Sequence, residues 1–503
     1  MSDAAPKTGP LRAITGSVPV PRNDNRVIWL LLAAAFVAIL NETTMGVAIP
    51  HLITDLHITA VAAQWLTTAF MLTMAVVIPI SGFLLQRLGT RMVFIAAMTL
   101  FSAGTLIALL SPGFELLVVA RVVQASGTAI MMPLLMTTIM TVVPPHGRGQ
   151  MMGRVSIVMA LAPAIGPTMS GFVLDTLGWR WIFGIVLPIA LVSLFVGARW
   201  MHDVGKQRNV RIDVLSVILS ALGFGGLVFG LSQIGGAEDA GGSAADAAAA
   251  EAMATVMLWV ALGVGVVALA LFIWRQLVLQ REDRALLDLR VFGYGNFSLS
   301  VAHFAVLSLA FFGTITVLPL YMQNSVGMTA LEAGLVVLPG SLAMGLAGPI
   351  IGRIYDVWGT RVLLVPGSIL TVALLWLFTS LSESTPVWEL LIVQTALSIG
   401  LAMSFTPLFT ASLGSLPPHL YSYGSAIVST VQQVAGAAGI AVMITIVNAG
   451  YLGAEAAGAT EAAAWAAGSR FSFLFAAVVA IPTILGAFLI RKPADAVDAP
   501  MPH

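Results

Sequence analysis

Two oppositely charged residues lie inside long apolar runs of this sequence. Glu42 belongs to LNETTMGVAIP (40–50) in the first apolar run, and Arg121 belongs to the fourth. A charge inside a bilayer costs free energy, so such residues usually face partners or ion pathways. Glu42 lies roughly 22 Å from one end of its run and Arg121 roughly 9 Å from the opposite surface, at about 1.5 Å per residue. In a core about 30 Å thick these depths nearly coincide, which predicts that the two charges pair and take part in the movement of protons.

The alternative for this pair is a structural ion pair that only fixes two helices. His303 is a weaker candidate for proton binding, because an imidazole changes charge near neutral pH; it could equally form a plain hydrogen bond between helices. Neutral polar and adaptable apolar side chains should line a substrate cavity near the pair. We expect this lining to include Asn41, Gln124, Met131, Gln432 and Phe312. For the polar residues among them the alternative is a helix–helix hydrogen bond, about 0.6 kcal/mol each.

The composition is that of a protein dissolved in lipid. Of the 503 residues 58% are hydrophobic and 9% charged, whereas a soluble domain carries about 25% charged residues. A net charge of zero argues against a nucleic-acid partner. The absence of cysteine excludes disulfides and thiolate metal sites. No nucleophile–base–acid set or metal-ligand cluster appears at one depth, so we expect neither an enzyme nor a bound metal or cofactor.

Fourteen apolar runs reach the length of about 20 residues that a membrane span needs, which predicts an all-α membrane protein. The runs are 27–50, 60–85, 91–111, 115–140, 152–175, 180–200, 212–234, 255–279, 297–322, 330–355, 361–381, 387–412, 424–449 and 471–490. With this numbering 20 of the 23 basic residues fall on the side of the two termini. Because basic loops stay in the cytoplasm, we expect cytoplasmic tails at 1–26 and 491–503. The segments 235–252 and 450–468 become outer connections, and the alanine content of the second would allow a short helix there.

An internal repeat divides the chain. Pro79-Ile80-x-Gly82, followed by Gly89-Thr90-Arg91, recurs 270 residues later as Pro349-Ile350-x-Gly352 and Gly359-Thr360-Arg361. Two equally oriented halves are typical of a transporter that rocks around a midplane site. We therefore expect six-helix bundles at 27–200 and 297–490, with an inserted helix pair at 212–279.

These motifs resemble the major facilitator superfamily, in particular its fourteen-helix drug:proton antiporters, over residues 27–490. The segments that carry the resemblance are GFLLQRLGTR (82–91), ARVVQASGTAIMMP (120–133), APAIGPTMSGFVL (162–174), GWRWIF (178–183), GRIYDVWGTR (352–361) and GSAIVSTVQQVAGAAGIAV (424–442). The first helix is similar to a branch in which L-N-E-T replaces L-D-x-T, so Asn41 occupies the usual acidic position and Glu42 carries the carboxylate.

The resemblance implies a set of gating residues, and plain helix packing is the alternative for Gly166 and Pro167 among them. The set comprises Gly82, Gln86, Arg87, Gly89, Arg91, Gly166, Pro167, Gly352, Asp356, Gly359 and Arg361. Two positions depart from the family pattern: Gln86 stands where an aspartate is usual, and Val357 where an arginine is frequent. An acidic residue at this position is thought to hold the inner gate shut. An amide supplies no charge, so we expect the contact at Gln86 to be weaker and Asp356 to contribute more to closing the gate.

The expected function is alternating-access export of amphiphilic, often cationic compounds in exchange for protons. The implied setting is a monomer in a bacterial cytoplasmic membrane, with small molecules, protons and the lipid bilayer as partners. No G-x-x-x-x-G-K-[ST] motif is present, so the proton gradient rather than ATP is the expected energy source. The alternative is export of one endogenous metabolite, lipid or envelope precursor by the same machinery. A receptor without transport would need a folded extramembrane domain, and no stretch outside the runs suits one.

Overall fold

The computed structural model describes residues 22–204, 212–233 and 244–493. Its long helices are α1 (Arg22–Leu56), α2 (Ala60–Leu110), α3 (Phe114–Val142), α4 (Arg148–Leu177), α5 (Arg180–Trp200), α6 (Val214–Ser232), α7 (Ala244–Leu279), α8 (Gly295–Asn324), α9 (Ala330–Trp358), α10 (Arg361–Leu377), α11 (Val387–Gly414), α12 (Tyr421–Ala456) and α13 (Glu461–Leu489). All of these helices are long and apolar enough to cross a membrane.

Helix α2 contains two of the predicted spans. It covers 51 residues, and its backbone leaves the helical region at Gly89, where φ is 80° and ψ is 165°. A left-handed φ is readily adopted only by glycine, so Gly89 allows a sharp turn between the two spans. The break in α2 accounts for the fourteenth span, and the prediction of an all-α membrane protein is confirmed.

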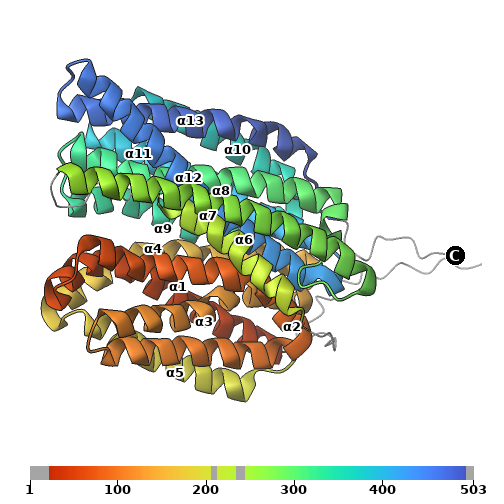
Figure 1. The fold of residues 1–503 in the computed structure, drawn as a ribbon. Coiled ribbons are helices and arrows are strands. Elements are labelled where there is room, and N and C mark those ends of the chain that lie inside the picture. The colour runs from red at the N-terminus through yellow and green to blue at the C-terminus, as the bar shows by residue number, and fades with distance from the viewer. Residues whose placement is uncertain (1–21, 205–211, 234–243, 494–503) are drawn as a thin grey trace, which may run out of the picture.

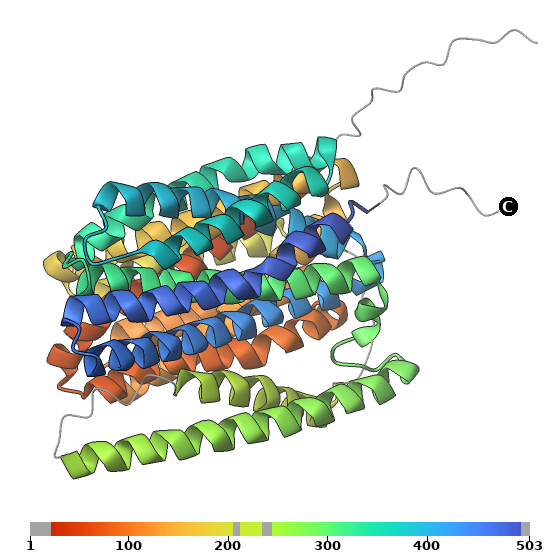
Figure 2. The ribbon, with the colours of Figure 1, turned by 90° about the horizontal axis from the view of Figure 1, so that it is seen from above.

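The helices form two groups that lie side by side (Figure 1). Helices α1 to α5 make one group and α8 to α13 the other, with α6 and α7 along one side of both (Figures 1 and 2). The groups meet where α4 packs against α9 and where α2 packs against α12. We call the end where α1 begins and α13 ends the tail face, and the opposite end the far face. The predicted bundle boundaries agree with this division in outline and stay a prediction.

Helix starts at the far face are capped by threonines. Thr59, Thr329 and Thr460 each accept a hydrogen bond from a backbone N–H in the first turn of α2, α9 and α13. Such caps satisfy N–H groups that have no partner inside the helix. They matter at a membrane surface because unpaired backbone groups are costly in lipid.

Two predicted outer segments are shorter than expected. Helix α12 continues to Ala456 and α13 begins at Glu461, so most of the segment 450–468, expected as an outer connection, is helical. The reason is the alanine content of this segment, since alanine has the highest helix propensity and extends the two membrane helices. In the other segment α7 begins at Ala244, so only the last part of 235–252 is described, and it is helical.

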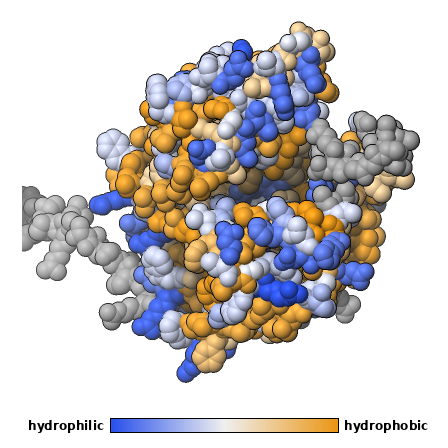
Figure 3. Space-filling view, turned by 90° about the vertical axis from the view of Figure 1, so that its left-hand side faces the viewer, coloured by the Kyte–Doolittle hydropathy of each residue, from blue (hydrophilic) through white to orange (hydrophobic). Residues whose placement is uncertain are grey.

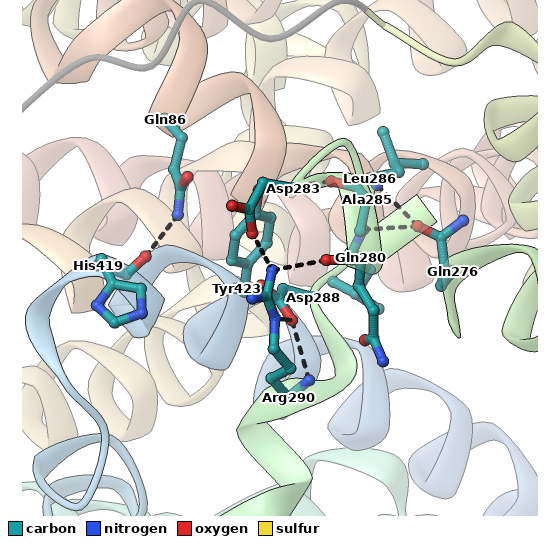
Figure 4. A network of polar contacts seen from close by, with 11 residues as sticks. Gln86, Gln276, Gln280, Asp283, Ala285, Leu286, Asp288, Arg290, His419 and Tyr423 are labelled. Carbon is teal, nitrogen blue, oxygen red and sulfur yellow. Dashed lines mark hydrogen bonds and ion pairs between the residues drawn. The ribbon is translucent and has the colours of Figure 1, made fainter. Parts of the chain in front are cut away.

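Polar contacts at the tail face fasten the inserted helices α6 and α7 to each other, and Figure 4 shows those that join α7 to the segment after it. Asp213, at the start of α6, accepts hydrogen bonds of 2.6 and 2.7 Å from the Arg275 guanidinium of α7. Gln276 donates to Ser216 Oγ at 2.8 Å and accepts from Leu286 N at 2.7 Å.

The segment that follows α7 is held in the same way. The Arg290 guanidinium pairs with Asp283 and Asp288. Tyr423 of α12 donates its hydroxyl to Ala285 O at 3.5 Å. The segment between α7 and α8 therefore contacts α12 at the tail face, close to the site where α2 meets α12.

Candidate transport site and gate

A cavity of about 70 Å³ lies between α1, α2, α3 and α12. Glu42 lines it from α1, Met131 from α3 and Gln432 from α12, and these are three of the residues that the sequence placed in the site. The far face above it is hollowed between the two groups of helices (Figure 3). Glu42 is therefore an acidic side chain on a cavity between the two groups.

Close contacts between α1 and α4 position this carboxylate. A Cβ on Gly166 would lie 2.2 Å from Thr43 Oγ1, so a glycine is needed beside the residue that follows Glu42. One turn later Ser170 donates its hydroxyl to Thr44 O at 2.9 Å. Pro167 follows Gly166 inside α4. Gly166 thus acts as a tight helix contact, whereas its gating role stays a prediction.

Arg121 is held by α2 and α3 rather than by Glu42. Its side chain is buried; Nε donates to Leu66 O at 3.4 Å and Nη1 donates to Gln124 Oε1 at 2.7 Å. The guanidinium carbon also lies 4.0 Å from the centre of the Phe70 ring, within the range of a cation–π interaction. Arg121 is thereby fixed without using the carboxylate.

Glu42 interacts with Arg121 through the electrostatic field alone. The positive charge acts on the carboxylate, yet within the described part of the chain Glu42 forms no hydrogen bond and no ion pair shorter than 4.0 Å. The predicted pairing of the two charges is therefore not formed as a direct contact in this structure, and the alternative of a structural ion pair lacks the same contact. A carboxylate without a protein partner is available to a proton or to a cationic ligand.

Three other predicted residues lie outside the lining of this cavity. Gln124 uses its amide oxygen for Arg121 and its nitrogen for Thr105 Oγ1 at 2.8 Å. Asn41 is buried, with neither amide atom bonded to the protein. Phe312 packs against Phe311 and lies over Gly436.

His303 is also remote from the cavity, since it packs between α8, α10 and α13. Its Nε2 lies 3.4 Å from Ser368 Oγ, and a Cβ on Gly486 would lie 3.2 Å from Nδ1. In this structure the imidazole is buried and does not face Glu42.

Sequence reasoning missed several lining residues that helical spacing would have found. Positions three and four residues apart lie on one face of a helix. From Glu42 this spacing leads back to Ile39 and Ala38, and from Met131 it leads back to Thr128. The lining residues that were not predicted include Met74, Thr128, Ser429 and Gln433.

At the tail face Asp356 joins the two groups by capping α4. Its two carboxylate oxygens accept hydrogen bonds of 2.8 Å from Gly149 N and from Gln150 N. These N–H groups belong to the first turn of α4, where a negative charge is favoured by the helix dipole. Lys492 donates to the Asp356 backbone carbonyl at 2.8 Å. Asp356 is thus a charged latch between α9 and α4.

The equivalent latch in the first half is uncharged. Gln86 donates through Nε2 to His419 O at 2.7 Å and to Ser422 Oγ at 3.0 Å, just before and inside the first turn of α12. The acceptor is a carbonyl, so a carboxylate here would meet another oxygen. This geometry explains how an amide can occupy a position that is usually acidic.

Glycines bring the two groups into backbone contact at the tail face. A Cβ on Gly352 of α9 would lie 2.0 Å from Gly149 O, and one on Gly153 of α4 would lie 2.1 Å from Gly348 O. On the other contact a Cβ on Gly82 would lie 2.8 Å from Ser422 O. The structure therefore describes a state that is closed at the tail face and hollowed at the far face.

Two further hydroxyl pairs cross between the groups. Thr137 Oγ1 and Ser425 Oγ lie 2.7 Å apart, and Ser156 Oγ and Thr406 Oγ1 lie 2.8 Å apart. They join α3 to α12 and α4 to α11. The closure is therefore built from many short contacts, to which Asp356 adds a charged one.

The remaining motif residues have local roles. Gly359, like Gly89, has a left-handed φ, of 83°. Arg91 donates to Ala198 O at 2.9 Å, which ties the turn after Gly89 to α5. The side chains of Arg87 and Arg361 form no hydrogen bond or ion pair in the part of the chain that is described.

We expect Asp356→Asn to shift the protein toward states that are open at the tail face. Asparagine loses the charge and places an N–H against a backbone N–H, which should cost about 1–2 kcal/mol, roughly a tenfold change in population. Distances between labels on α4 and α9 at the tail face would measure it. Glu332→Gln is the control, because Glu332 caps only its own helix, at the other end of α9. If the label distances in Asp356→Asn are distributed as in the wild type, Asp356 does not hold α4 and α9 together.

Comparison with known proteins decides the family. The model of the Major Facilitator Superfamily matches residues 31–440. The chain belongs to the major facilitator superfamily. It is therefore a multi-pass membrane transporter rather than an enzyme, and the resemblance drawn from the motifs is confirmed at this level.

Relatives in the superfamily match nearly the whole chain. The lincomycin resistance protein LmrB of Listeria monocytogenes is 41% identical over 479 residues, covering 94% of this chain and 97% of LmrB. The uncharacterized MFS-type transporter YcnB of Bacillus subtilis is 40% identical over 473 residues, covering 94% and 96%. The structure of the human organic anion transporter MFSD10 superposes with a TM-score of 0.64 at 13% identity, covering 92% of this chain and 99% of MFSD10, which shows the shared fold.

Proposed function

We propose that this protein exports amphiphilic, often cationic compounds in exchange for protons, as a member of the fourteen-helix drug:proton antiporters with an L-N-E-T first helix. The observation that carries the proposal is Glu42, an acidic side chain without a protein partner on a cavity between the two groups. Such a carboxylate can hold either a proton or a cationic substrate, and exchanging one for the other couples their movement. The similarity to a lincomycin resistance protein supports a drug-like substrate.

The distribution of the basic residues supports a tail face that lies on the cytoplasmic side of a bacterial cytoplasmic membrane, together with both termini. In that orientation the structure corresponds to an outward-facing state. The cavity of about 70 Å³ is smaller than the roughly 300–1,000 Å³ of a drug-sized site. A substrate must therefore occupy the hollow above Glu42 or bind to a wider state, in which Gln432 and Met131 stay within reach.

Transport into proteoliposomes with an imposed pH gradient tests the proposal. Purified protein should accumulate lipophilic monocations against their gradient, and the accumulation should collapse when a protonophore dissipates the pH difference. A neutral membrane permeant of similar size serves as the reference for leakage. Transport that responds only to zwitterionic or acidic metabolites would favour the endogenous-metabolite alternative. Transport that ignores the pH gradient would refute proton coupling.

A further inference from the structure

Arginine and tryptophan side chains alternate across three helices at the tail face of the first group. The Arg154 guanidinium of α4 lies 5.5 Å from the centre of the Trp29 ring of α1. One turn earlier on α1, the Arg26 guanidinium lies 5.8 Å from the centre of the Trp200 ring of α5. Because α1 packs against both α4 and α5, the four side chains form a row that runs over α1 from one neighbour to the other. We call this row the Arg–Trp row.

The row is exposed, and no described residue neutralises its charges. Trp29 is 55% and Trp200 51% exposed. Neither Arg26 nor Arg154 pairs with a carboxylate in the described part of the chain; the one hydrogen bond of Arg154 goes to the Met151 sulfur at 3.9 Å. Two guanidiniums held over indole rings are ordered but retain free N–H donors.

The surface beyond the row is apolar. Ala33, one turn further along α1, is exposed, and Ile189 on α5 is 44% exposed. Tryptophan is enriched where membrane meets water, with its ring at the level of the lipid headgroups. Arginine binds phosphate through paired N–H groups. The row therefore offers cations at headgroup level and an apolar path for acyl chains toward the membrane centre.

We infer that the Arg–Trp row binds the headgroup of an anionic phospholipid. The phosphate is held between Arg26 and Arg154, and the indoles of Trp29 and Trp200 lie beside the glycerol and upper acyl chains. Such a lipid bridges α4 and α5 over α1, the helix that carries Glu42. The site is independent of the transported substrate, because it lies on the outer surface of the first group and not on the cavity.

Native mass spectrometry of the delipidated full chain, with added lipid, tests this site. Dioleoylphosphatidylglycerol should be retained and dioleoylphosphatidylcholine should not. Each of Arg26→Gln and Arg154→Gln should weaken retention about fivefold, and the double variant about 25-fold, given the worth of one basic residue near an anionic surface. Arg353→Gln, which removes an exposed tail-face arginine of α9, is the matched control and should bind as the wild type does.

Two further arms make the result decisive. Glycerol 1-phosphate in large excess should not displace the lipid; displacement would mean a site for free phosphate and would overturn the lipid assignment. The variants Arg26→Lys and Arg154→Lys keep the charge but lose the planar fork, so they should retain more lipid than the glutamine variants. Equal retention by the wild type and the glutamine variants, or an equal loss in Arg353→Gln, would also overturn the inference. If the double variant does not fold, the single variants decide.

Discussion

Glu42→Gln is expected to abolish transport driven by a pH gradient while the protein still binds its substrates. Glutamine keeps the size and a hydrogen-bonding group but cannot exchange a proton, so the cavity loses the carboxylate that couples the two movements. Neutral ligands should bind unchanged, and cationic ligands roughly tenfold more weakly because a charge-assisted contact is lost. The measurements are counterflow and gradient-driven uptake in proteoliposomes, together with ligand binding in detergent.

Proton release upon substrate binding identifies the carboxylate directly. The wild type should release protons into weakly buffered detergent solution when a cationic substrate binds, and Glu42→Gln should release none. His303→Gln is the matched control, because His303 is buried away from the cavity, and it should release protons as the wild type does. Equal release from the wild type and Glu42→Gln would assign the coupling to another group.

Arg121 provides a second test of the same site. Arg121→Lys should retain more coupled transport than Arg121→Ala, because lysine keeps the positive charge that acts on Glu42. It should remain below the wild type, since an ammonium lacks the planar fork that donates to both Leu66 O and Gln124. Equal activity of the two variants would show that the charge of Arg121 does not matter to the exchange.

Gly352→Ala and Gly153→Ala are expected to prevent closure at the tail face and so to stop turnover. The added Cβ atoms would lie 2.0 Å from Gly149 O and 2.1 Å from Gly348 O. The obstacle is backbone, so no side-chain rotation relieves it and α4 must separate from α9. Overpacking of this kind typically costs about 1–3 kcal/mol, which shifts the balance of states by roughly tenfold or more.

The same two helices supply the controls for these variants. A Cβ added at Gly171 on α4 or at Gly334 on α9 would meet no atom within 4 Å, so Gly171→Ala and Gly334→Ala should transport normally. Label distances across α4 and α9 measure the closure, and the absence of native cysteine allows single labels without background. If Gly352→Ala closes at the tail face and transports fully, closure does not depend on the close backbone contact between α4 and α9.

The sequence predicted the spans well because a bilayer imposes a simple rule on length and polarity. The run 60–85 and the run 91–111 were predicted as separate spans, and α2, which contains both, turns between them at Gly89. The extent of helix within the segment 450–468 was not predictable, because length alone does not show where a helix stops after it leaves the membrane. Its alanines continue α12 and α13 instead of forming a connection.

The candidate site was predictable where charge marks it and less so elsewhere. Glu42 and Arg121 stand out because isolated charges are rare in apolar runs. Gln124 was expected on the cavity, but its amide is used by Arg121 and Thr105, a local arrangement that no linear pattern reveals. Gln433 has the pattern of any polar residue in a span, and its place beside Gln432 on the lining depends on the rotation of α12.

The two latches of the tail face respond differently to the solution around them. The Asp356 contact joins a charge to a helix dipole, so dissolved salt weakens it, whereas the amide contact of Gln86 is between neutral groups. Raising the ionic strength therefore loosens the side where α4 meets α9 and leaves the side where α2 meets α12 nearly unaffected. We therefore expect the tail face to open first between α4 and α9 in concentrated electrolyte, while the contact between α2 and α12 persists longer.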